Sequence, residues 1–355
     1  MFEVKAIQAE HGDALLVSYG DTSPHHILID GGPAGTLHNL LGVLEGCKRN
    51  GRVCLEALVV THYDLDHIDG VIELLQAKPE WLDINDIWFN GYQHIAPADV
   101  LGSAEGDRLA KLIEGVYPWN FRFGGGPIKV GNKQPLEMPG GLKVWILSPD
   151  QDRLTRLAVE WGDGKVVPES SDPAVPKDLL GRKDEWPPLE FADLASAPRS
   201  SDGSIPNGSS IALLLEFDEQ RLLLTGDAFA TVVGDAIEAY WDTPPVVHLL
   251  KVSHHGSKAN TTDKLLKTLQ CKRFLISTSG KGHGHPDHVL IARLVGSTNQ
   301  PELIFNYDCE RTANWRKPPA DWPRFSATFP HPAECFVRVA LPLIEEAPLV
   351  ERMEP

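Results

Sequence analysis

The sequence predicts a layered α/β fold, and two observations support this prediction. Segments with the alternating or continuous apolar character of strands alternate with segments whose apolar residues recur at helical spacing. The chain has 355 residues, of which 42% are hydrophobic. A chain of this length and composition can bury a core without disulfide or metal staples.

The first half of the chain begins with three short apolar segments separated by turn signals at 11–13 and 20–21, which together predict a β-meander. After it, strands and helices alternate. The predicted elements of this half are strands at 2–7, 14–19 and 25–30, a helix at 36–47, a strand at 55–60, a helix at 71–76, a strand at 84–89 and a helix at 104–114.

The segment from about 150 to 206 is rich in proline, serine and charged residues, and we interpret it as an insertion or lid within one domain that covers 1–355. A C-terminal extension is expected from about 300, with Trp315 and Trp322 buried on the chain's own core. Between these parts we predict a hairpin at 211–217 and 221–227, a helix at 229–240, a strand at 246–252, a helix at 262–269 and a strand at 273–278.

The net charge of −16 argues against a broad basic surface that binds nucleic acid through its phosphates. A local basic groove or bound divalent ions would still attract an anionic substrate. The five cysteines form no close pair, which favours a reducing cytoplasm. The N-terminus lacks a leader pattern, and no apolar run is long enough to span a bilayer, so we expect no membrane contact.

Four potential metal ligands lie between a predicted buried strand and a helix: His62, Asp64, Asp66 and His67. In an extended loop alternate residues point the same way, so the first three would face one cavity, and His67 would enter from the helix. Imidazole and carboxylate groups suit Zn²⁺, Mn²⁺ or Fe. The alternative is that Asp66 only caps the helix and that the histidines are surface residues.

This motif resembles the HxHxDH motif of the metallo-β-lactamase superfamily. Two later segments, Leu224–Asp227 and Val252–Ser257, look like the superfamily's strand-ending aspartate and its last metal-binding histidine. The resemblance implies a four-layer αββα sandwich in which Asp227 bridges two metals. It covers most of the chain, from the opening meander to about Leu294.

The sequence is also similar to the hydrolase domain of the competence protein ComEC and its free-standing relatives. Their pattern is matched by Gly12-Asp13-Ala14, by Ile29-Asp30-Gly31-Gly32 and by Gly284-His285-Pro286, in addition to the motifs above. The resemblance favours action on a phosphodiester, with nucleic acid or a nucleotide as the substrate.

Several matched residues also have a purely structural interpretation. Asp13 and Asp30 are expected to organise turns, and Asp30 also to support a ligand from behind. Asp227 precedes a predicted helix and could be its N-cap, although its strand-end position favours a ligand. From an extended backbone His254 and His255 cannot both face one cavity, so one would be a ligand and the other a supporting or substrate-binding group.

Two departures from the superfamily pattern leave the metal open. Asp64 replaces the second histidine of the motif, which makes Mn²⁺ as suitable as Zn²⁺. The histidine of the third motif is absent, and Asn207 stands near its place as a weak ligand or substrate contact. We therefore expect one or two divalent ions, Zn or Mn.

Further residues are candidates for contacts with the substrate. His285 precedes Pro286, which we expect to open a helix whose free N–H groups hold an anion, so His285 is a candidate for phosphate or leaving-group binding. Ser257 and Lys258 are candidates for phosphate binding, although a solvated lysine is an equal alternative.

The expected function is therefore metal-dependent hydrolysis, with Asp66 orienting the attacking water and His285 stabilising negative charge. A phosphodiesterase or nuclease is favoured. The alternatives are hydrolysis of a carboxyl-type bond (lactone, thioester or β-lactam) by the same chemistry, and a non-catalytic binding module.

Overall fold

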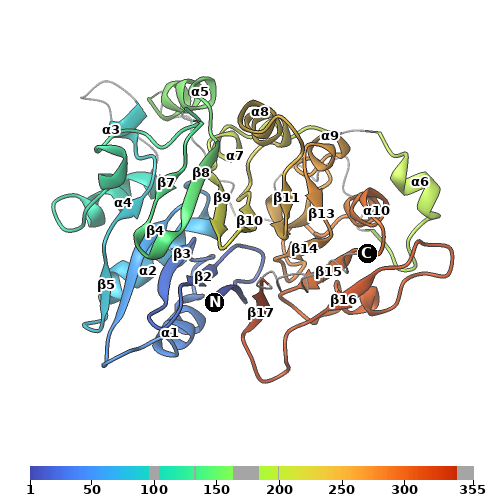
Figure 1. The fold of residues 1–355 in the computed structure, drawn as a ribbon, viewed down its shortest axis with the longest axis horizontal. Coiled ribbons are helices and arrows are strands. Elements are labelled where there is room, and N and C mark those ends of the chain that lie inside the picture. Colours follow the sequence, from blue (N-terminus) through green and yellow to red (C-terminus); the bar gives the residue numbers. More distant parts are fainter. Residues whose placement is uncertain (96–103, 132, 163–183, 199, 342–355) are drawn as a thin grey trace, which may run out of the picture.

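The computed structural model describes residues 1–95, 104–131, 133–162, 184–198 and 200–341 (Figure 1). The other residues, which include 163–183 and 199 of the predicted insertion, lie outside the described part.

The first sheet begins with the predicted meander, because β1, β2 and β3 pair antiparallel in sequence order. β4 then joins β3 in parallel, which requires the helical connection between them. In spatial order the sheet runs β17-β1-β2-β3-β4-β5, with β6 also paired to β4. Its strands are β1 (Phe2–Ile7), β2 (Leu15–Tyr19), β3 (His25–Ile29), β4 (Val53–Val59), β5 (Leu82–Ile84), β6 (Ile87–Trp88) and β17 (Phe336–Ala340).

The second sheet contains the predicted hairpin of β9 and β10, whose turn residues Asp218 and Glu219 both have positive φ. The sheet runs β16-β15-β14-β12-β10-β9-β8-β7. Its strands are β7 (Leu136–Glu137), β8 (Lys143–Ser148), β9 (Ala212–Phe217), β10 (Gln220–Leu224), β12 (Leu249–Lys251), β14 (Arg273–Ile276), β15 (Glu302–Phe305) and β16 (Ser326–Thr328).

The strand predicted at 246–252 is split at His248, whose Nδ1 accepts a hydrogen bond from the Arg221 N–H at 3.0 Å. The two pieces, β11 (Val246–Val247) and β12, belong to different sheets, since β11 pairs with β13 (Gln270–Cys271).

Helices connect the strands and cover the outer faces of both sheets (Figure 1). The α-helices are α1 (Leu37–Glu45), α2 (Leu65–Ala77), α3 (Tyr92–Ile95), α4 (Ala104–Ile113), α5 (Gln151–Gly162), α6 (Phe191–Ala195), α7 (Ile205–Gly208), α8 (Ala230–Tyr240), α9 (Asp263–Lys267) and α10 (His288–Ser297). The 3₁₀ turns are η1 (Phe121–Phe123), η2 (Pro139–Gly141), η3 (His254–Gly256) and η4 (Ala313–Arg316).

Three apolar clusters separate these elements into four layers. On β9, Leu213 and Leu215 belong to the cluster between the two sheets, whereas Leu214 belongs to the cluster beneath α8, α9 and α10. This alternation is what the two-residue period of a strand produces. A third cluster lies between the first sheet and the helices α1 and α2. The arrangement is the αββα sandwich that the sequence led us to expect.

Residues of the predicted insertion and of the predicted C-terminal extension contribute to the core and to the sheets. The first residues of the predicted insertion form α5, where Leu157 and Trp161 are buried in the core. The residues from about 300 add strands to both sheets, because β15 pairs with β14 and β17 pairs with β1. As predicted, Trp315 and Trp322 are buried on the chain's own core.

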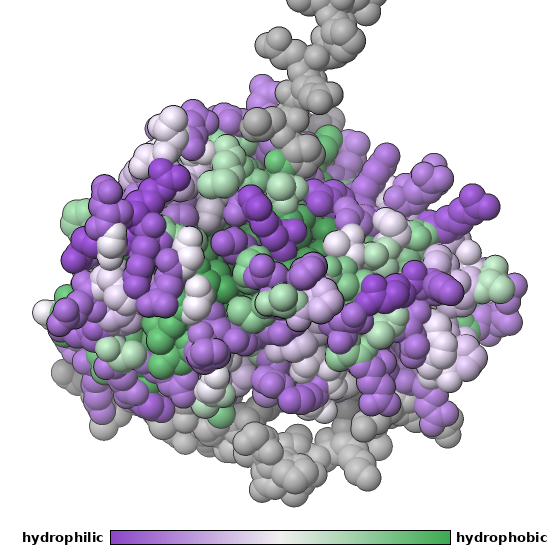
Figure 2. All heavy atoms as spheres, turned by 90° about the horizontal axis from the view of Figure 1, so that it is seen from below, coloured by the Kyte–Doolittle hydropathy of each residue, from purple (hydrophilic) through white to green (hydrophobic). Residues whose placement is uncertain are grey.

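Hydrophilic side chains cover most of the face seen in Figure 2, and apolar residues appear between them in small groups. Within the described residues, no helix is both long enough and apolar enough to cross a membrane. All five cysteines lie in described segments and are free thiols.

Candidate metal centre

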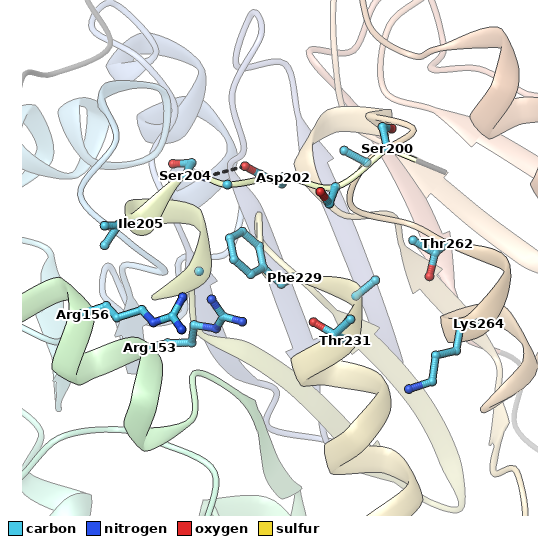
Figure 3. A pocket seen from close by; sticks show the side chains of 15 residues that line it. Arg153, Arg156, Ser200, Asp202, Ser204, Ile205, Phe229, Thr231, Thr262 and Lys264 are labelled. Atoms are coloured by element: carbon cyan, nitrogen blue, oxygen red, sulfur yellow. Dashed lines mark hydrogen bonds between the residues drawn. The ribbon is translucent and has the colours of Figure 1, made fainter. Parts of the chain in front are cut away.

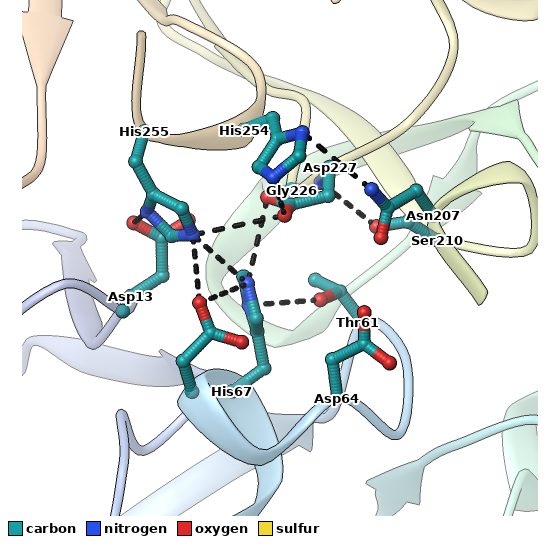
Figure 4. Close-up of polar contacts among 12 residues, drawn as sticks. Asp13, Thr61, Asp64, His67, Asn207, Ser210, Gly226, Asp227, His254 and His255 are labelled. Atoms are coloured by element: carbon teal, nitrogen blue, oxygen red, sulfur yellow. Dashed lines mark hydrogen bonds and ion pairs between the residues drawn. The ribbon is translucent and has the colours of Figure 1, made fainter. Parts of the chain in front are cut away.

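The sequence-predicted ligands meet where strands of both sheets end (Figure 4). The first sheet contributes the residues after β4, and the second contributes those after β10 and β12. Loops at the carboxyl ends of strands are the usual place for binding sites in α/β folds.

The first motif is not an extended loop throughout. Asp64 occupies the N-cap position of α2 with extended backbone angles (φ −65°, ψ 143°), so the helix begins at Leu65 rather than after Gly70. Asp66 and His67 consequently lie in the first helical turn, where a carboxylate is favoured by the helix dipole. Asp66 was expected to face the cavity because alternate residues of an extended loop point the same way. This reason is wrong, since Asp66 lies in a helix, although its side chain does reach the centre.

Ligand atoms of four residues surround one point of this centre. His255 Nε2 lies 3.1 Å from Asp66 Oδ2 and 3.2 Å from His67 Nε2. Asp227 completes the group, with Oδ1 at 3.4 Å from His67 Nε2 and Oδ2 at 3.6 Å from His255 Nε2. The ligands of a tetrahedral ion bound at about 2.1 Å are about 3.4 Å apart. The spacing of these atoms therefore fits a bound transition metal.

His254 and His255 both face Asp227, contrary to the expectation from an extended backbone. Both residues have left-handed φ angles, 50° and 53°, within the turn η3. His254 Nε2 consequently lies 3.7 Å from Asp227 Oδ2, nearly as close as His255. The premise that one imidazole must turn away is wrong, because the chain after β12 does not continue as a strand.

Asp227 is held by its backbone, which leaves its carboxylate available. Its N–H donates to Ser210 Oγ at 3.0 Å. The preceding Gly226 has a positive φ of 48°, and a side chain at this position would collide with Ser210 Oγ. Helix α8 has Phe229 at its N-cap, so Asp227 does not cap it. Among the described residues, Asp227 Oδ1 has no hydrogen-bond donor. Such a buried oxygen fits a metal ligand.

His62 lies beside His67, with ring centroids 4.3 Å apart. Its Nδ1 is 3.0 Å from Thr61 Oγ1, and its Nε2 is 3.3 Å from Asp64 Oδ2. The buried Nε2 makes no hydrogen bond within the part of the chain that the structure describes. This second unsatisfied atom also fits a ligand role.

The ionisable groups of the centre are coupled by charge. Burial opposes ionisation of Asp66, but the positive charges of His67 and His255 outweigh it and lower the pKa of this carboxyl. Burial likewise disfavours protonated His255, but Asp227 and Asp13 raise its pKa to about 9. The carboxylates thus stabilise positive charge on the neighbouring histidines. A bound metal ion would supply this positive charge and would displace the histidine protons.

Asp13 lies behind His255 rather than among the central atoms. One group of possible ligand atoms, all within 4.8 Å of one another, comes from Asp13, His67, Asp227 and His255. However, Asp13 Oδ1 is 3.4 Å from His255 Nδ1, the ring nitrogen opposite the centre, and Asp13 Oδ2 pairs with buried Lys251. We therefore assign Asp13 to holding His255, and Asp66 to the centre.

Asp30 holds His67 from behind, as the sequence led us to expect. Its Oδ2 is 2.8 Å from His67 Nδ1 and accepts from Thr61 Oγ1, while its Oδ1 accepts from the Thr61 N–H. Such a carboxylate fixes which imidazole nitrogen faces the metal.

Replacing Asp30 by asparagine should lower metal affinity by about 10- to 100-fold, because the side chain that orients His67 loses its charge. Asparagine tolerates the left-handed backbone of this position (φ 58°). Competition with a chromogenic chelator measures the change. Asp83→Asn, at an exposed ion pair with Arg52, is the matched control. Equal affinities of the two variants would contradict the assignment.

The residues predicted to bind substrate lie around His254. Asn207 Nδ2 donates to Asp202 Oδ2 at 2.7 Å and lies 3.5 Å from His254 Nδ1. Ser257 Oγ accepts from the Ala259 N–H, so this hydroxyl is engaged within its own loop. The substrate contacts proposed for both residues stay predictions.

His285 lies near the same histidine, but not at a helix start. Its ring centroid is 5.6 Å from that of His254, and burial lowers its pKa. Helix α10 begins at His288 instead of Pro286, and the His288 N–H already donates to Asp184 Oδ2 at 2.6 Å. The expected anion site at this helix start is therefore occupied by the chain's own carboxylate. The Lys258 N–H likewise donates to Asp287 Oδ2.

The sequence did not identify two residues that position His254. Asn260 Oδ1 is 3.1 Å from His254 Nδ1, and Asp202 Oδ2 is 3.5 Å from the same atom. Asp202 lies in the proline- and serine-rich segment, where no pattern distinguished it from its neighbours.

Comparisons with known proteins are consistent with these observations. No protein-family model matches the chain. ComE operon protein 3 of Bacillus subtilis (strain 168) is 28% identical over 153 residues, which make up 43% of this chain and only 18% of that protein.

Similar solved structures include the metallo-β-lactamase fold protein YhfI from Bacillus subtilis, with a TM-score of 0.44 and 12% identity over 96% of this chain and 100% of that one. Zn²⁺-bound PqqB from Methylobacterium extorquens has a TM-score of 0.42 and 12% identity over 92% of this chain and 87% of that one. Human tRNase Z, short form, has a TM-score of 0.40 and 13% identity over 96% and 99%. These similarities are low, and the fold assignment rests on the layers and motifs of this chain.

Proposed function

Because the chain has the αββα fold of the metallo-β-lactamase superfamily, we propose that it is a metal-dependent hydrolase that cleaves phosphodiester bonds. The observation that carries the metal-dependent part of this proposal is the convergence of Asp66, His67, Asp227 and His255, with spacings of 3.1–3.8 Å between the atoms that face one another. The choice of a phosphodiester rests on the resemblance of the sequence motifs to those of the ComEC hydrolase domain. The mixture of carboxylate and imidazole ligands suits Zn²⁺ and Mn²⁺.

The same four residues would hold one ion, and His62, Asp64 and His254 are the candidates to complete its coordination or to hold a second. A bound divalent ion would supply Lewis acidity and lower the pKa of water toward neutrality. The orphaned atoms His62 Nε2 and Asp227 Oδ1 support this assignment, because each is buried without a hydrogen-bond partner in the described residues.

Asp66 is the candidate to orient the attacking water. Its side chain is 21% exposed, compared with 3% for Asp227, so a substrate can reach it from outside. An ionised carboxylate only accepts hydrogen bonds, and a group that orients the attacking water must accept one from it. His285, at the edge of the centre beside His254, is the candidate to donate a hydrogen bond to a phosphate oxygen.

Turnover of three substrates by the chelated and then metal-restored protein tests the reaction class. With Mn²⁺ or Zn²⁺ we expect hydrolysis of bis(p-nitrophenyl) phosphate and of plasmid DNA, and little hydrolysis of nitrocefin. The chelated protein is the control and should be inactive on all three. A metal-loaded protein that cleaved only nitrocefin would overturn the proposal in favour of the carboxyl-type alternative.

A further inference from the structure

A pocket of about 550 Å³ lies next to the candidate metal centre (Figure 3). We call it the side pocket; the residues that matter for its chemistry are Arg153, Arg156, Asp202, Phe229, Thr231 and Lys264. Its volume lies within the range of about 300–1,000 Å³ that is usual for small-molecule sites.

Two links join the side pocket to the centre. Asp202 lines the pocket, and its Oδ2 is 3.5 Å from His254 Nδ1. Phe229, which also lines the pocket, follows Asp227 by two residues in the loop between β10 and α8. The side pocket therefore borders the loops that carry His254 and Asp227.

Two arginines on α5 give the pocket a positive charge. Arg153 and Arg156 form no ion pair within the residues that the structure describes, and Arg153 Nε is buried without a hydrogen-bond acceptor there. The Arg153 guanidinium lies 4.8 Å from the centroid of the Phe229 ring. Figure 3 shows both guanidinium groups on the side of α5 that faces this ring. A buried guanidinium nitrogen without a hydrogen-bond partner is unfavourable, and an anionic acceptor would stabilise it.

The opposite wall adds donors. The first turn of α8 contributes Ala230 and Thr231 to the lining, and the described residues offer no side-chain cap for this helix. Such a helix start attracts negative charge. Lys264 is less available, because its Nζ pairs with Asp235 Oδ1 at 3.1 Å.

The acid in the lining, Asp202, does not cancel this charge. Its Oδ2 accepts from Asn207 Nδ2 at 2.7 Å and from Asn260 Nδ2 at 2.8 Å. The Asp202 carboxylate is thus hydrogen-bonded on the side of the metal centre, whereas the two arginines lie on α5.

We infer that the side pocket binds a second phosphate group of the substrate, carried by the same molecule as the phosphodiester cleaved at the metal centre. The inference rests on the proposed function, since the scissile bond is assumed to be a phosphodiester. It assigns Arg153 and Arg156 to substrate binding, and it defines the substrate class as a nucleic-acid strand or a nucleotide with two or more phosphates.

Binding of fluorescein-labelled pentathymidylate to the chelated protein tests the inference without hydrolysis. We expect the double variant Arg153→Gln/Arg156→Gln to bind at least about tenfold more weakly by fluorescence anisotropy, because charge-assisted hydrogen bonds are lost. The slope of log affinity against log salt should fall by about 0.7 for each phosphate contact removed. Arg108→Gln, at an exposed arginine of α4 outside the pocket lining, is the matched control.

Two further probes identify what the arginines recognise. A pentamer with uncharged methylphosphonate linkages should bind the protein and the double variant equally, whereas Arg153→Lys/Arg156→Lys should recover part of the affinity for the charged strand. Inorganic pyrophosphate that displaces the strand from the protein would indicate a nucleotide-like substrate. Failure to displace the strand would indicate a longer nucleic acid.

Unchanged affinity and unchanged salt dependence in the double glutamine variant would overturn the inference. Failure of the proposed function has a different signature. In that case binding would still depend on the two arginines, but the metal-restored protein would cleave neither bis(p-nitrophenyl) phosphate nor the bound strand.

Discussion

Replacing Asp227 by asparagine should remove metal binding and metal-dependent hydrolysis together. The Asp227 carboxylate lies between three histidines, with Oδ1 3.4 Å from His67 Nε2 and Oδ2 3.6 and 3.7 Å from the Nε2 atoms of His255 and His254. Asparagine keeps the shape of the side chain but loses the negative charge and one acceptor oxygen. Removing a ligand should cost more than the about 100-fold loss of affinity seen when an outer partner is removed.

Elemental analysis after dialysis against Mn²⁺ or Zn²⁺, together with bis(p-nitrophenyl) phosphate turnover, measures both effects. Asp308→Asn, at an exposed ion pair with Arg316, is the matched control and should keep both its metal and its activity. Circular dichroism of the variants shows whether the fold is retained. An Asp227→Asn protein that folds, retains stoichiometric metal and turns over substrate normally would refute its role as a ligand.

Replacing Lys251 by methionine should destabilise the protein by about 3–5 kcal/mol, the usual effect of removing one partner of a buried ion pair. Lys251 is fully buried on β12, and its Nζ pairs with Asp13 and lies 3.4 Å from the Gly226 carbonyl oxygen. Without the lysine, the Asp13 carboxylate is left in the interior, where His255 Nδ1 lies 3.4 Å from its Oδ1. Urea unfolding of the chelated protein measures the loss.

The double variant Asp13→Asn/Lys251→Met separates stability from function. It leaves no uncompensated charge, so we expect it to recover a large part of the lost unfolding free energy. Its metal affinity should stay below that of the unmodified protein, because Asp13 no longer holds His255 Nδ1. A single Lys251→Met variant as stable as the original protein would contradict the importance of this ion pair.

Local patterns in the sequence predicted much of the fold. The strands β1, β2, β3, β9 and β10 are short apolar segments bounded by turn residues, which is a local pattern. Their predicted bounds agree with the structure within one residue, except that β10 ends at Leu224 rather than at Asp227. β17 pairs with β1, and Ala340 lies opposite Glu3. No local sequence pattern predicts this pairing, because the two strands are far apart in the sequence. β15 was not predicted either; it pairs in parallel with the preceding strand β14, and α10 connects the two.

In the candidate site, too, only the features with a local sequence pattern were predicted. Residue type and spacing identified His62, Asp66 and His67, because several metal-ligand types close together are rare in a surface loop. The positive φ angles of His254 and His255 have no such signature, since neither residue is glycine. Arg153 could not be placed at the site either, because its position depends on how α5 packs beside Phe229.

The most direct test of the metal centre is anomalous diffraction from a crystal soaked with Mn²⁺ or Zn²⁺ and a phosphate analogue. The proposed site predicts an anomalous peak at about 2.0–2.2 Å from His67 Nε2, His255 Nε2 and a carboxylate oxygen of Asp227. A fully loaded crystal with its metal elsewhere, or with no peak among these three side chains, would contradict it.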